Sequence, residues 1–290
     1  MTGARYIPVL TILAGIVVAW YVGAYLMNAP FQRQLDRRAG EAPTTIEFIA
    51  KTMSQPKPTL PAPHQVAVNF FENTFLRNVT SGRSLVYHSW VTLSSTLLGF
   101  LFGTVLGIVI SIGIVHVLAL DRSLMPWIIA SQTIPILALA PMIVVVFAAI
   151  GLTGLIPKAL ISTYLSFFPV AVGMVKGLRS PERAYLDLMH TYNSSRSQVL
   201  WKLRLPASVP FLFASMKVAI AASLVGAIVG ELPTGAVAGI GAKLLAGSYY
   251  SQTIDMFAAL IAGSVVAVLL VTAVGIAGRI TERAMGAQPA

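Results

Sequence analysis

Long apolar runs are the feature that most constrains the fold of this 290-residue chain. A helix needs about twenty apolar residues to cross the hydrocarbon core of a bilayer, and six runs approach or exceed that length. These runs cover residues 6–27, 88–117, 124–150, 157–175, 209–230 and 254–278. Because 56% of the residues are hydrophobic and only 10% are charged, no stretch remains for a soluble catalytic domain. The sequence therefore predicts an all-α fold, a polytopic membrane helical bundle with about six transmembrane helices.

The basic residues predict how this bundle is oriented in the membrane. The formal net charge is +10, and basic side chains gather between the fourth and fifth apolar runs and after the sixth. They are Lys176, Arg179, Arg183, Arg196, Lys202, Arg204, Arg279 and Arg283. Short loops rich in Lys and Arg stay on the cytoplasmic side, so we expect both chain termini in the cytoplasm. The same rule makes a membrane surface, rather than nucleic acid, the expected surroundings of this positive charge.

The runs also predict how the chain is divided along its length. The predicted parts are an N-terminal transmembrane helix at 1–27, an extracytoplasmic segment at 28–87, a membrane core at 88–283 with a cytoplasmic loop at 180–208, and a C-terminal tail at 284–290. Within the extracytoplasmic segment, the proline-rich stretch 55–63 predicts an extended strap. The stretch 66–76 after it predicts a short amphipathic helix.

A stripe of small residues follows one face of the second apolar run. Every fourth residue is Gly or Ser, namely Ser95, Gly99, Gly103, Gly107 and Ser111. Helices in lipid are held together by close van der Waals packing, which small residues permit. The stripe therefore indicates either a tight packing seam in a transporter core or an ordinary contact of a helical bundle.

The third apolar run contains two prolines, Pro135 and Pro141, each of which removes a backbone hydrogen bond. We expect them to bend or open this helix beside Ser131, Gln132 and Thr133. Non-helical backbone at membrane depth is tolerated where it lines a water-filled cavity. These five residues are therefore candidates for a transport pathway, with a simple structural kink as the alternative.

Catalytic and metal-binding signatures are missing from the sequence. The chain has no cysteine, and its four histidines follow no metal-ligand spacing. It has no phosphate-binding loop of the kind that hydrolyses ATP, and no Gly-x-Ser-x-Gly nucleophile motif. Lys217, Glu231 and Asp255 fall near the ends of apolar runs, whereas ion-driven carriers commonly keep such a residue at mid-membrane. The sequence therefore gives no sign of an enzyme, a metal site or a cofactor in this chain, and it argues against an ion-driven carrier.

The loop between the fourth and fifth runs interrupts the apolar pattern with mixed charges and aromatic residues. Helical spacing of its apolar residues predicts a short helix from about residue 182 to 192. Asn193 is expected to end this helix, because Asn tolerates the left-handed conformation. A second helix is expected from Ser197 to Leu205, with Pro206 and Pro210 turning the chain back into the membrane. Such a loop suits docking on a soluble partner, or else lies on lipid headgroups.

From Asp187 to Pro206 the sequence resembles the EAA loop of permease subunits in bacterial ABC importers. That loop reads Glu-Ala-Ala, three residues, Gly, nine residues and Ile-x-Leu-Pro. The positions that match without a gap are Asp187, Leu188, Met189, Asn193, Leu203, Leu205 and Pro206. Asp in place of Glu is a mild change. Leu188 and Met189 are bulkier than alanine, which suggests a co-adapted ATPase groove or an asymmetric pair of permeases.

Five further segments resemble the nitrate, sulfonate and taurine branch of this family, at 60–66, 88–100, 132–141, 166–178 and 239–244. The resemblance implies a type I ABC importer permease of the bacterial inner membrane, carrying a small polar or anionic solute such as a sulfonate, nitrate or a thiamine precursor. It also implies a second permease chain, a cytoplasmic ATPase dimer that binds ATP and magnesium, and an extracytoplasmic solute-binding protein. The matched positions, with Glu182 and Tyr192, would couple to the ATPase. A secondary carrier or channel without an ATPase remains the alternative.

Overall fold

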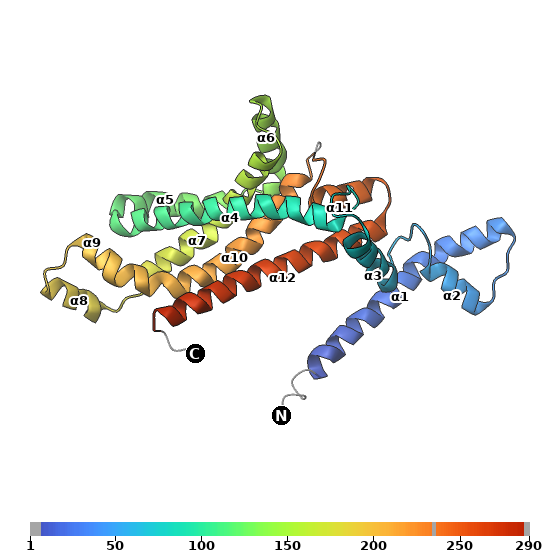
Figure 1. Ribbon diagram of the computed structural model, residues 1–290, viewed down its shortest axis with the longest axis horizontal. Helices are drawn as coiled ribbons and strands as arrows, with labels where there is room; N and C mark the ends of the chain where they lie inside the picture. Colours follow the sequence, from blue (N-terminus) through green and yellow to red (C-terminus); the bar gives the residue numbers. More distant parts are fainter. Residues whose placement is uncertain (1–6, 234–235, 287–290) are drawn as a thin grey trace. The chain divides into compact units, whose positions relative to one another are not determined.

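The computed structural model describes residues 7–233 and 236–286, and every regular element in these ranges is helical. The elements are α1 (Ile7–Ala39), α2 (Thr45–Met53), α3 (Pro63–Phe71), η2 (Glu72–Leu76), α4 (Leu85–His116), α5 (Leu118–Ser131), α6 (Ile136–Ala149), α7 (Leu155–Leu178), α8 (Arg183–Thr191), α9 (Arg196–Val199), η3 (Leu200–Arg204), α10 (Leu205–Glu231), α11 (Ile240–Tyr249) and α12 (Thr253–Ala284) (Figure 1). Residues 287–290 of the predicted tail and residues 1–6 lie outside the described residues.

The described chain forms two compact units. One contains the described residues up to His88 together with Lys243–Gly263, and the other contains those of Ser89–Ala242 and of the chain from Ser264 onward. Both α4 and α12 therefore contribute to each unit.

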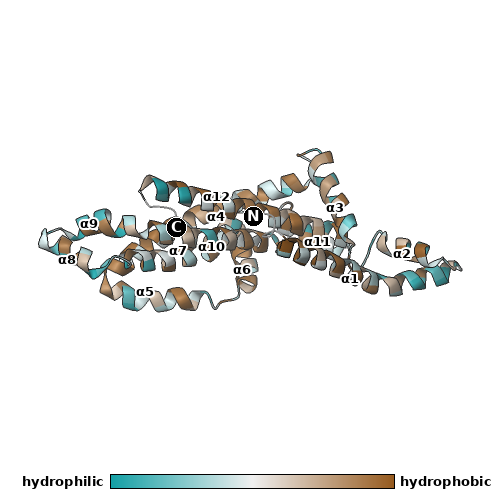
Figure 2. Ribbon diagram, turned by 90° about the horizontal axis from the view of Figure 1, so that it is seen from below, coloured by the Kyte–Doolittle hydropathy of each residue, from teal (hydrophilic) through white to brown (hydrophobic). Residues whose placement is uncertain are grey.

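The number of membrane-length helices confirms the predicted bundle. Among the described residues, five helical runs are long and apolar enough to span a bilayer, and the bent pair α5 and α6 makes a sixth if it is counted as one span. Figure 2 shows hydrophobic residues along α4, α7 and α10, whereas hydrophilic residues recur along α8 and α9. The apolar runs therefore form the spans, and the charged loop forms two short helices.

The third apolar run is bent at its first proline, as the sequence predicts. It divides into α5 and α6, which meet at an angle of 96° (Figure 1). The backbone N–H groups of Gln132, Thr133 and Ile134 donate hydrogen bonds to the carbonyls three residues earlier in the chain. Pro135 is then the N-cap of α6. Because Pro135 has no N–H and the turn before it is tight, the helix opens into two segments at this point. Pro141 lies inside α6 and does not end it.

The expectation that Pro206 and Pro210 turn the chain is wrong. The elements α9, η3 and α10 follow one another without a break from Arg196 to Glu231. Pro206 lies in the first turn of α10, and η3 is a wide π-helical turn in which the N–H of Leu205 donates to the carbonyl of Leu200. A wide turn accommodates a proline that lacks a donor, so the helix continues through it.

The smaller unit holds the proline-rich stretch against α1. The side-chain amide of Asn28 donates to the carbonyl of Leu60 at 2.8 Å and its oxygen accepts from the N–H of Thr59 at 2.8 Å. The indole of Trp20 donates to the carbonyl of Pro61 at 2.9 Å. Residues 55–62 of this stretch are non-helical, as predicted, whereas Pro63 is the first residue of α3, which η2 follows. Helix α1 continues to Ala39, well past the boundary expected at residue 27.

Candidate functional site

The predicted short helix of the charged loop is α8. Its N-cap is Glu182, whose backbone is extended, and its C-cap is Tyr192. Asn193 has a φ of +50°, the left-handed conformation that the sequence predicts. The N–H of Ser194 donates to the carbonyl of Met189 at 3.0 Å, and that of Asn193 to the carbonyl of His190 at 2.9 Å. These two bonds form the Schellman motif, which satisfies the last carbonyls of a helix that stops abruptly.

Helix α8 has an anchored face and an exposed apolar face. Leu186 and Met189 are half-buried. The exposed large residues follow helical spacing and are Tyr185 at 56%, Leu188 at 51% and Tyr192 at 75% exposure. Asp187 and Asn193 are also exposed. Sequence reasoning missed Tyr185, although its spacing from Leu188 and Tyr192 places all three on one side.

The remaining part of the loop is joined firmly to the membrane helices. The guanidinium of Arg204 donates to the carbonyl of Leu178, at the end of α7, at 3.0 Å. Leu200 and Leu205 pack against the buried cluster formed by Val170, Met174, Leu178 and Ala219 on α7 and α10. Leu203 is half-buried, and Pro206 is exposed. This part of the loop is therefore in direct contact with α7 and α10.

The small-residue stripe of α4 lies against α7. A Cβ atom added to Gly99 would lie 2.2 Å from the Cβ of Ser162, and one added to Gly103 would lie 2.0 Å from the Oγ of Ser166. A Cβ at Gly107 would lie 2.8 Å from the Cβ of Val170. The carbonyl of Gly99 accepts hydrogen bonds from the hydroxyls of Thr163 and Ser166, each at 3.2 Å. Ser95 and Ser111, at the ends of the stripe, are fully buried.

Helix α10 packs on α7 and α4 in the same way. A Cβ atom at Gly226 would lie 2.8 Å from the Cα of Ser162, and one at Gly173 would lie 2.4 Å from the Cβ of Ser215. The hydroxyl of Ser223 donates to the carbonyl of Thr96 on α4 at 2.8 Å. Such close backbone approaches make α4, α7 and α10 one block.

A buried polar cluster lies at the other end of α10, around Glu231. This carboxylate is fully buried and accepts from the hydroxyl of Thr92 at 2.9 Å and from the N–H of Gly241 at 2.8 Å. The ammonium group of Lys158 lies 3.8 Å from the carboxylate and donates to the carbonyl of Ala238 at 3.2 Å. The cluster therefore joins α4, α7, α10 and the start of α11.

This cluster was not found by sequence reasoning, which placed Glu231 only near the end of its span. Gly239 has a φ of +129°, and a Cβ atom there would lie 2.1 Å from the Cδ of Glu231. A signal was present in the sequence, because Gly239 and Gly241 follow an isolated acidic residue. A buried carboxylate requires such close donors and a counter-charge.

The candidate pathway residues lie at the break between α5 and α6, except Pro141, which is inside α6. The hydroxyls of Ser131 and Thr133 donate to carbonyls of α5 at 2.7 and 2.8 Å. The carbonyl of Ser131 accepts from the hydroxyl of Tyr164 on α7. The side-chain amide of Gln132 donates to the Oγ of Ser131 at 3.3 Å. The break is thus hydrogen-bonded to α7, and the hydroxyls of Ser131 and Thr133 donate to backbone carbonyls of α5.

The described part of the chain contains a block of close-packed apolar helices and a short helix with an exposed apolar face. Within residues 7–233 and 236–286, no three His, Asp or Glu side chains come together as a metal site. The chain belongs to the family described as binding-protein-dependent transport system inner membrane component, which matches residues 99–287. The family resemblance expected from the sequence is therefore confirmed.

Several relatives support this assignment. A probable ABC transporter permease protein of Haemophilus influenzae is 31% identical over 74% of this chain and 82% of its own length. The formylaminopyrimidine transport permease protein ThiX of Halalkalibacterium halodurans is 31% identical over 64% of this chain and 69% of its own. The riboflavin transport system permease protein RibX of Chloroflexus aurantiacus is 30% identical over 77% of this chain and 80% of its own.

A solved structure has the same fold. It is that of the MetNI methionine ABC transporter in an inward-facing conformation, with a TM-score of 0.59 and 20% identity. The match covers 69% of this chain and 95% of the chain in that structure. The all-α fold predicted for an ABC importer permease is therefore confirmed.

Proposed function

We propose that this chain pairs with a second permease chain, identical or related, to form the path of a binding-protein-dependent ABC importer. A cytoplasmic ATPase dimer, which binds ATP and magnesium, docks on the loop 180–208, and an extracytoplasmic solute-binding protein delivers the solute. In this proposal both termini are cytoplasmic, and the segment 28–87 lies outside.

The single observation that carries the proposal is the two-sided construction of α8. Tyr185, Leu188 and Tyr192 are more than half exposed and share one side of a helix that is too short to be a membrane span. Leu186 and Met189 of the same helix are half-buried. A groove on the ATPase that covers the exposed side chains would remove their apolar surface from water.

The coupling mechanism follows from the continuity of the chain between α9 and α10. The helical run Arg196–Glu231 has 36 residues, which corresponds to a length of roughly 54 Å. Closure of the ATPases on ATP binding pushes α8, and the bond from Arg204 to Leu178 passes this displacement to α7 and α10. At the far end, the Glu231 cluster extends the coupling to Thr92 of α4 and to Lys158 of α7. The three-helix block therefore moves as one body between the outward-open and inward-open states.

The proposed solute is a small polar or anionic compound such as a sulfonate, nitrate or a thiamine precursor. The names of the pyrimidine and riboflavin permeases among the relatives favour a nitrogen heterocycle within that class. Ser131, Gln132, Thr133, Pro135 and Pro141 remain the candidate pathway residues. Specificity would then reside largely in the solute-binding protein, so the ligand of that protein identifies the solute.

Association with the ATPase tests the proposal. The variant Leu188→Ser with Tyr192→Ser removes two exposed apolar side chains and leaves Leu186 and Met189 in place. The matched control is Tyr249→Ser, which removes an exposed aromatic residue of α11, outside the loop 180–208. Affinity purification from membranes of the source cell should recover a P-loop ATPase with the control and the parent chain, and little with the double variant. Equal recovery with all three would favour the carrier or channel without an ATPase.

A further inference from the structure

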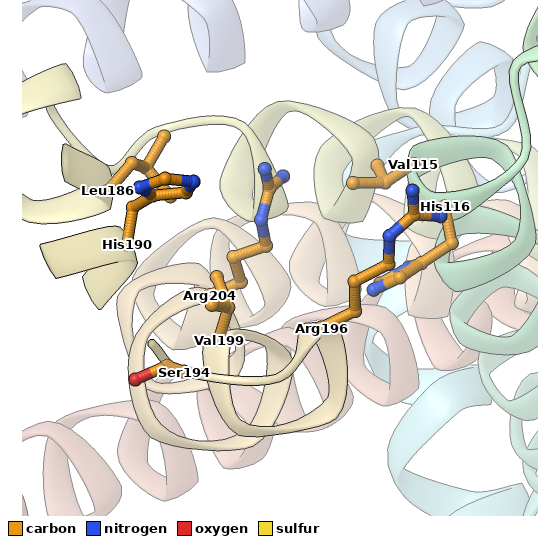
Figure 3. Close-up of a pocket in the computed structure, with 8 residues that line it drawn as sticks. All are labelled: Val115, His116, Leu186, His190, Ser194, Arg196, Val199 and Arg204. Carbon is orange, nitrogen blue, oxygen red and sulfur yellow. The ribbon is translucent and has the colours of Figure 1, made fainter. Parts of the chain in front are cut away.

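A cavity of about 390 Å³ lies behind α8, on the side away from the proposed ATPase contact. Its lining comes from the end of α4, from α8, and from the helical run that begins with α9 (Figure 3). The lining residues are Val115, His116, Leu186, His190, Ser194, Arg196, Val199 and Arg204. We refer to this cavity as the basic pocket. Neither the coupling mechanism nor the family match assigns it a role.

The charges around the basic pocket are all positive or neutral. Two guanidinium groups and two imidazoles line it, and the lining contains no carboxylate. Figure 3 shows the side chain of Arg196 extending toward His116. Within the part of the chain that the structure describes, neither Arg196 nor Arg204 has a carboxylate within 4.0 Å, while Arg179 nearby in sequence is paired with Asp121 at 2.9 Å. Two arginines without a counter-charge in one cavity favour an anion.

The hydrogen bonds in the pocket leave donors available to such an anion. Arg204 uses one Nη1–H for the carbonyl of Leu178, and a guanidinium has five N–H groups. The Nδ1 of His116 donates to the carbonyl of Ile112 at 2.8 Å, so Nε2 of the neutral ring is an acceptor and the donors for an anion come from the two arginines. Paired guanidinium groups bind phosphate oxygens well, because their planar donors match the phosphate geometry.

The position of the pocket along the helices points to phosphate at a membrane surface. His116 is the last residue of the spanning helix α4, and Arg196 is the first residue of the membrane-length run Arg196–Glu231. The lining is therefore at the level where lipid headgroups carry their phosphates. Val115, Leu186 and Val199 make the rest of the wall apolar, which suits the glycerol and first acyl carbons of a lipid. This argument holds for either leaflet and does not depend on the proposed orientation.

We propose that the basic pocket binds a phosphate group through Arg196 and Arg204, supplied by an anionic lipid headgroup or by soluble phosphate. The bound group touches α4 through His116, α8 through His190 and the α10 run through both arginines. The bound group therefore stabilises the present position of α8, on the side of this helix away from the proposed ATPase contact. An anionic membrane would then tune how readily α8 moves, independently of whether an ATPase is present.

Native mass spectrometry of the assembled transporter tests the site with phosphatidylglycerol as the probe and phosphatidylcholine as the uncharged reference. Arg196→Gln removes one pocket guanidinium, and Lys202→Gln removes an exposed charge of the same loop that does not line the pocket. We expect Arg196→Gln to bind phosphatidylglycerol roughly five- to tenfold more weakly than the parent, with phosphatidylcholine binding unchanged. Lys202→Gln should match the parent, and Arg196→Lys should be intermediate. Equal phosphatidylglycerol binding by the parent and Arg196→Gln overturns the proposal.

A second measurement does not depend on the folding of Arg196→Gln. Ser194 lines the pocket, and the chain has no native cysteine, so Ser194→Cys provides a single thiol there. Protection of this thiol from a maleimide by phosphatidylglycerol vesicles, but not by inorganic phosphate, supports the lipid as the source. Protection by inorganic phosphate in phosphatidylcholine vesicles supports the soluble source. The absence of protection by either overturns the site.

Discussion

Replacing Gly103 by alanine should force α4 and α7 apart. The new Cβ atom would lie 2.0 Å from the Oγ of Ser166, 3.1 Å from its Cβ and 3.0 Å from the backbone nitrogen of Phe167. Carbon atoms in contact prefer about 3.5–4.0 Å, so the helices must separate by roughly 1 Å or the hydroxyl must rotate. Either response weakens the hydrogen bond from Ser166 to the carbonyl of Gly99, which measures 3.2 Å.

The expected cost is about 2–4 kcal/mol. Overpacking a close interface costs roughly 1–3 kcal/mol, and losing the Ser166 hydrogen bond adds about 1 kcal/mol. The purified complex should therefore unfold at a temperature lower by about 5 °C or more, as followed by tryptophan fluorescence. Ser166→Gly in the same chain removes the two clashing side-chain atoms and should restore most of the loss.

The matched control is Gly15→Ala on α1. A Cβ atom at Gly15 has no neighbour within 4 Å, so the same substitution should leave the unfolding temperature unchanged or raise it slightly. If Gly103→Ala unfolds with the parent chain, or if Ser166→Gly gives no recovery, the seam between α4 and α7 does not determine stability as argued.

Three further outcomes follow from the site. Glu231→Gln leaves the buried ammonium of Lys158 opposite a neutral amide and should lower the free energy of unfolding by about 3 kcal/mol. Lys158→Met in the same chain should partly restore this loss. If Glu231→Gln alone is as stable as the parent chain, this reasoning is contradicted. Asn193→Val places a β-branched residue in a left-handed conformation and should reduce solute-stimulated ATP hydrolysis in reconstituted membranes, whereas Asn193→Gly should not. Equal hydrolysis rates for the Val variant and the parent chain would show that the helix end is dispensable. A cysteine at Ser195 should react with an impermeant thiol reagent only from the cytoplasmic side, and labelling of intact cells would reverse the orientation.

The sequence predicts those features that depend on neighbours along the chain. The apolar runs locate the spans, and helical spacing with Asn193 locates α8 and its left-handed end. Whether a helix ends at a proline or continues through it is harder to predict, because the outcome depends on the turn that precedes the proline. A tight turn at Gln132 ends α5 before Pro135, whereas the π turn of η3 lets the helix continue through Pro206.

The features that sequence reasoning missed depend on contacts between distant residues. Thr92 and Glu231 are 139 positions apart, so neither the hydroxyl donor nor the complete burial of the carboxylate follows from local pattern. Tyr185 was missed for a related reason. The apolar residues of α8 fit two overlapping helical faces, and only the packing of Leu186 and Met189 decides which face is covered.

The central claim, that the exposed face of α8 is the ATPase contact, is tested most directly by cross-linking. A benzophenone attached to Leu188→Cys in this cysteine-free chain should form a covalent adduct with the ATPase chain on illumination. The control is Val237→Cys, which is 96% exposed beyond the far end of α10 and should give no such adduct. If the ATPase co-purifies in full with the labelled variant but Leu188→Cys captures none of it, the ATPase contact lies elsewhere.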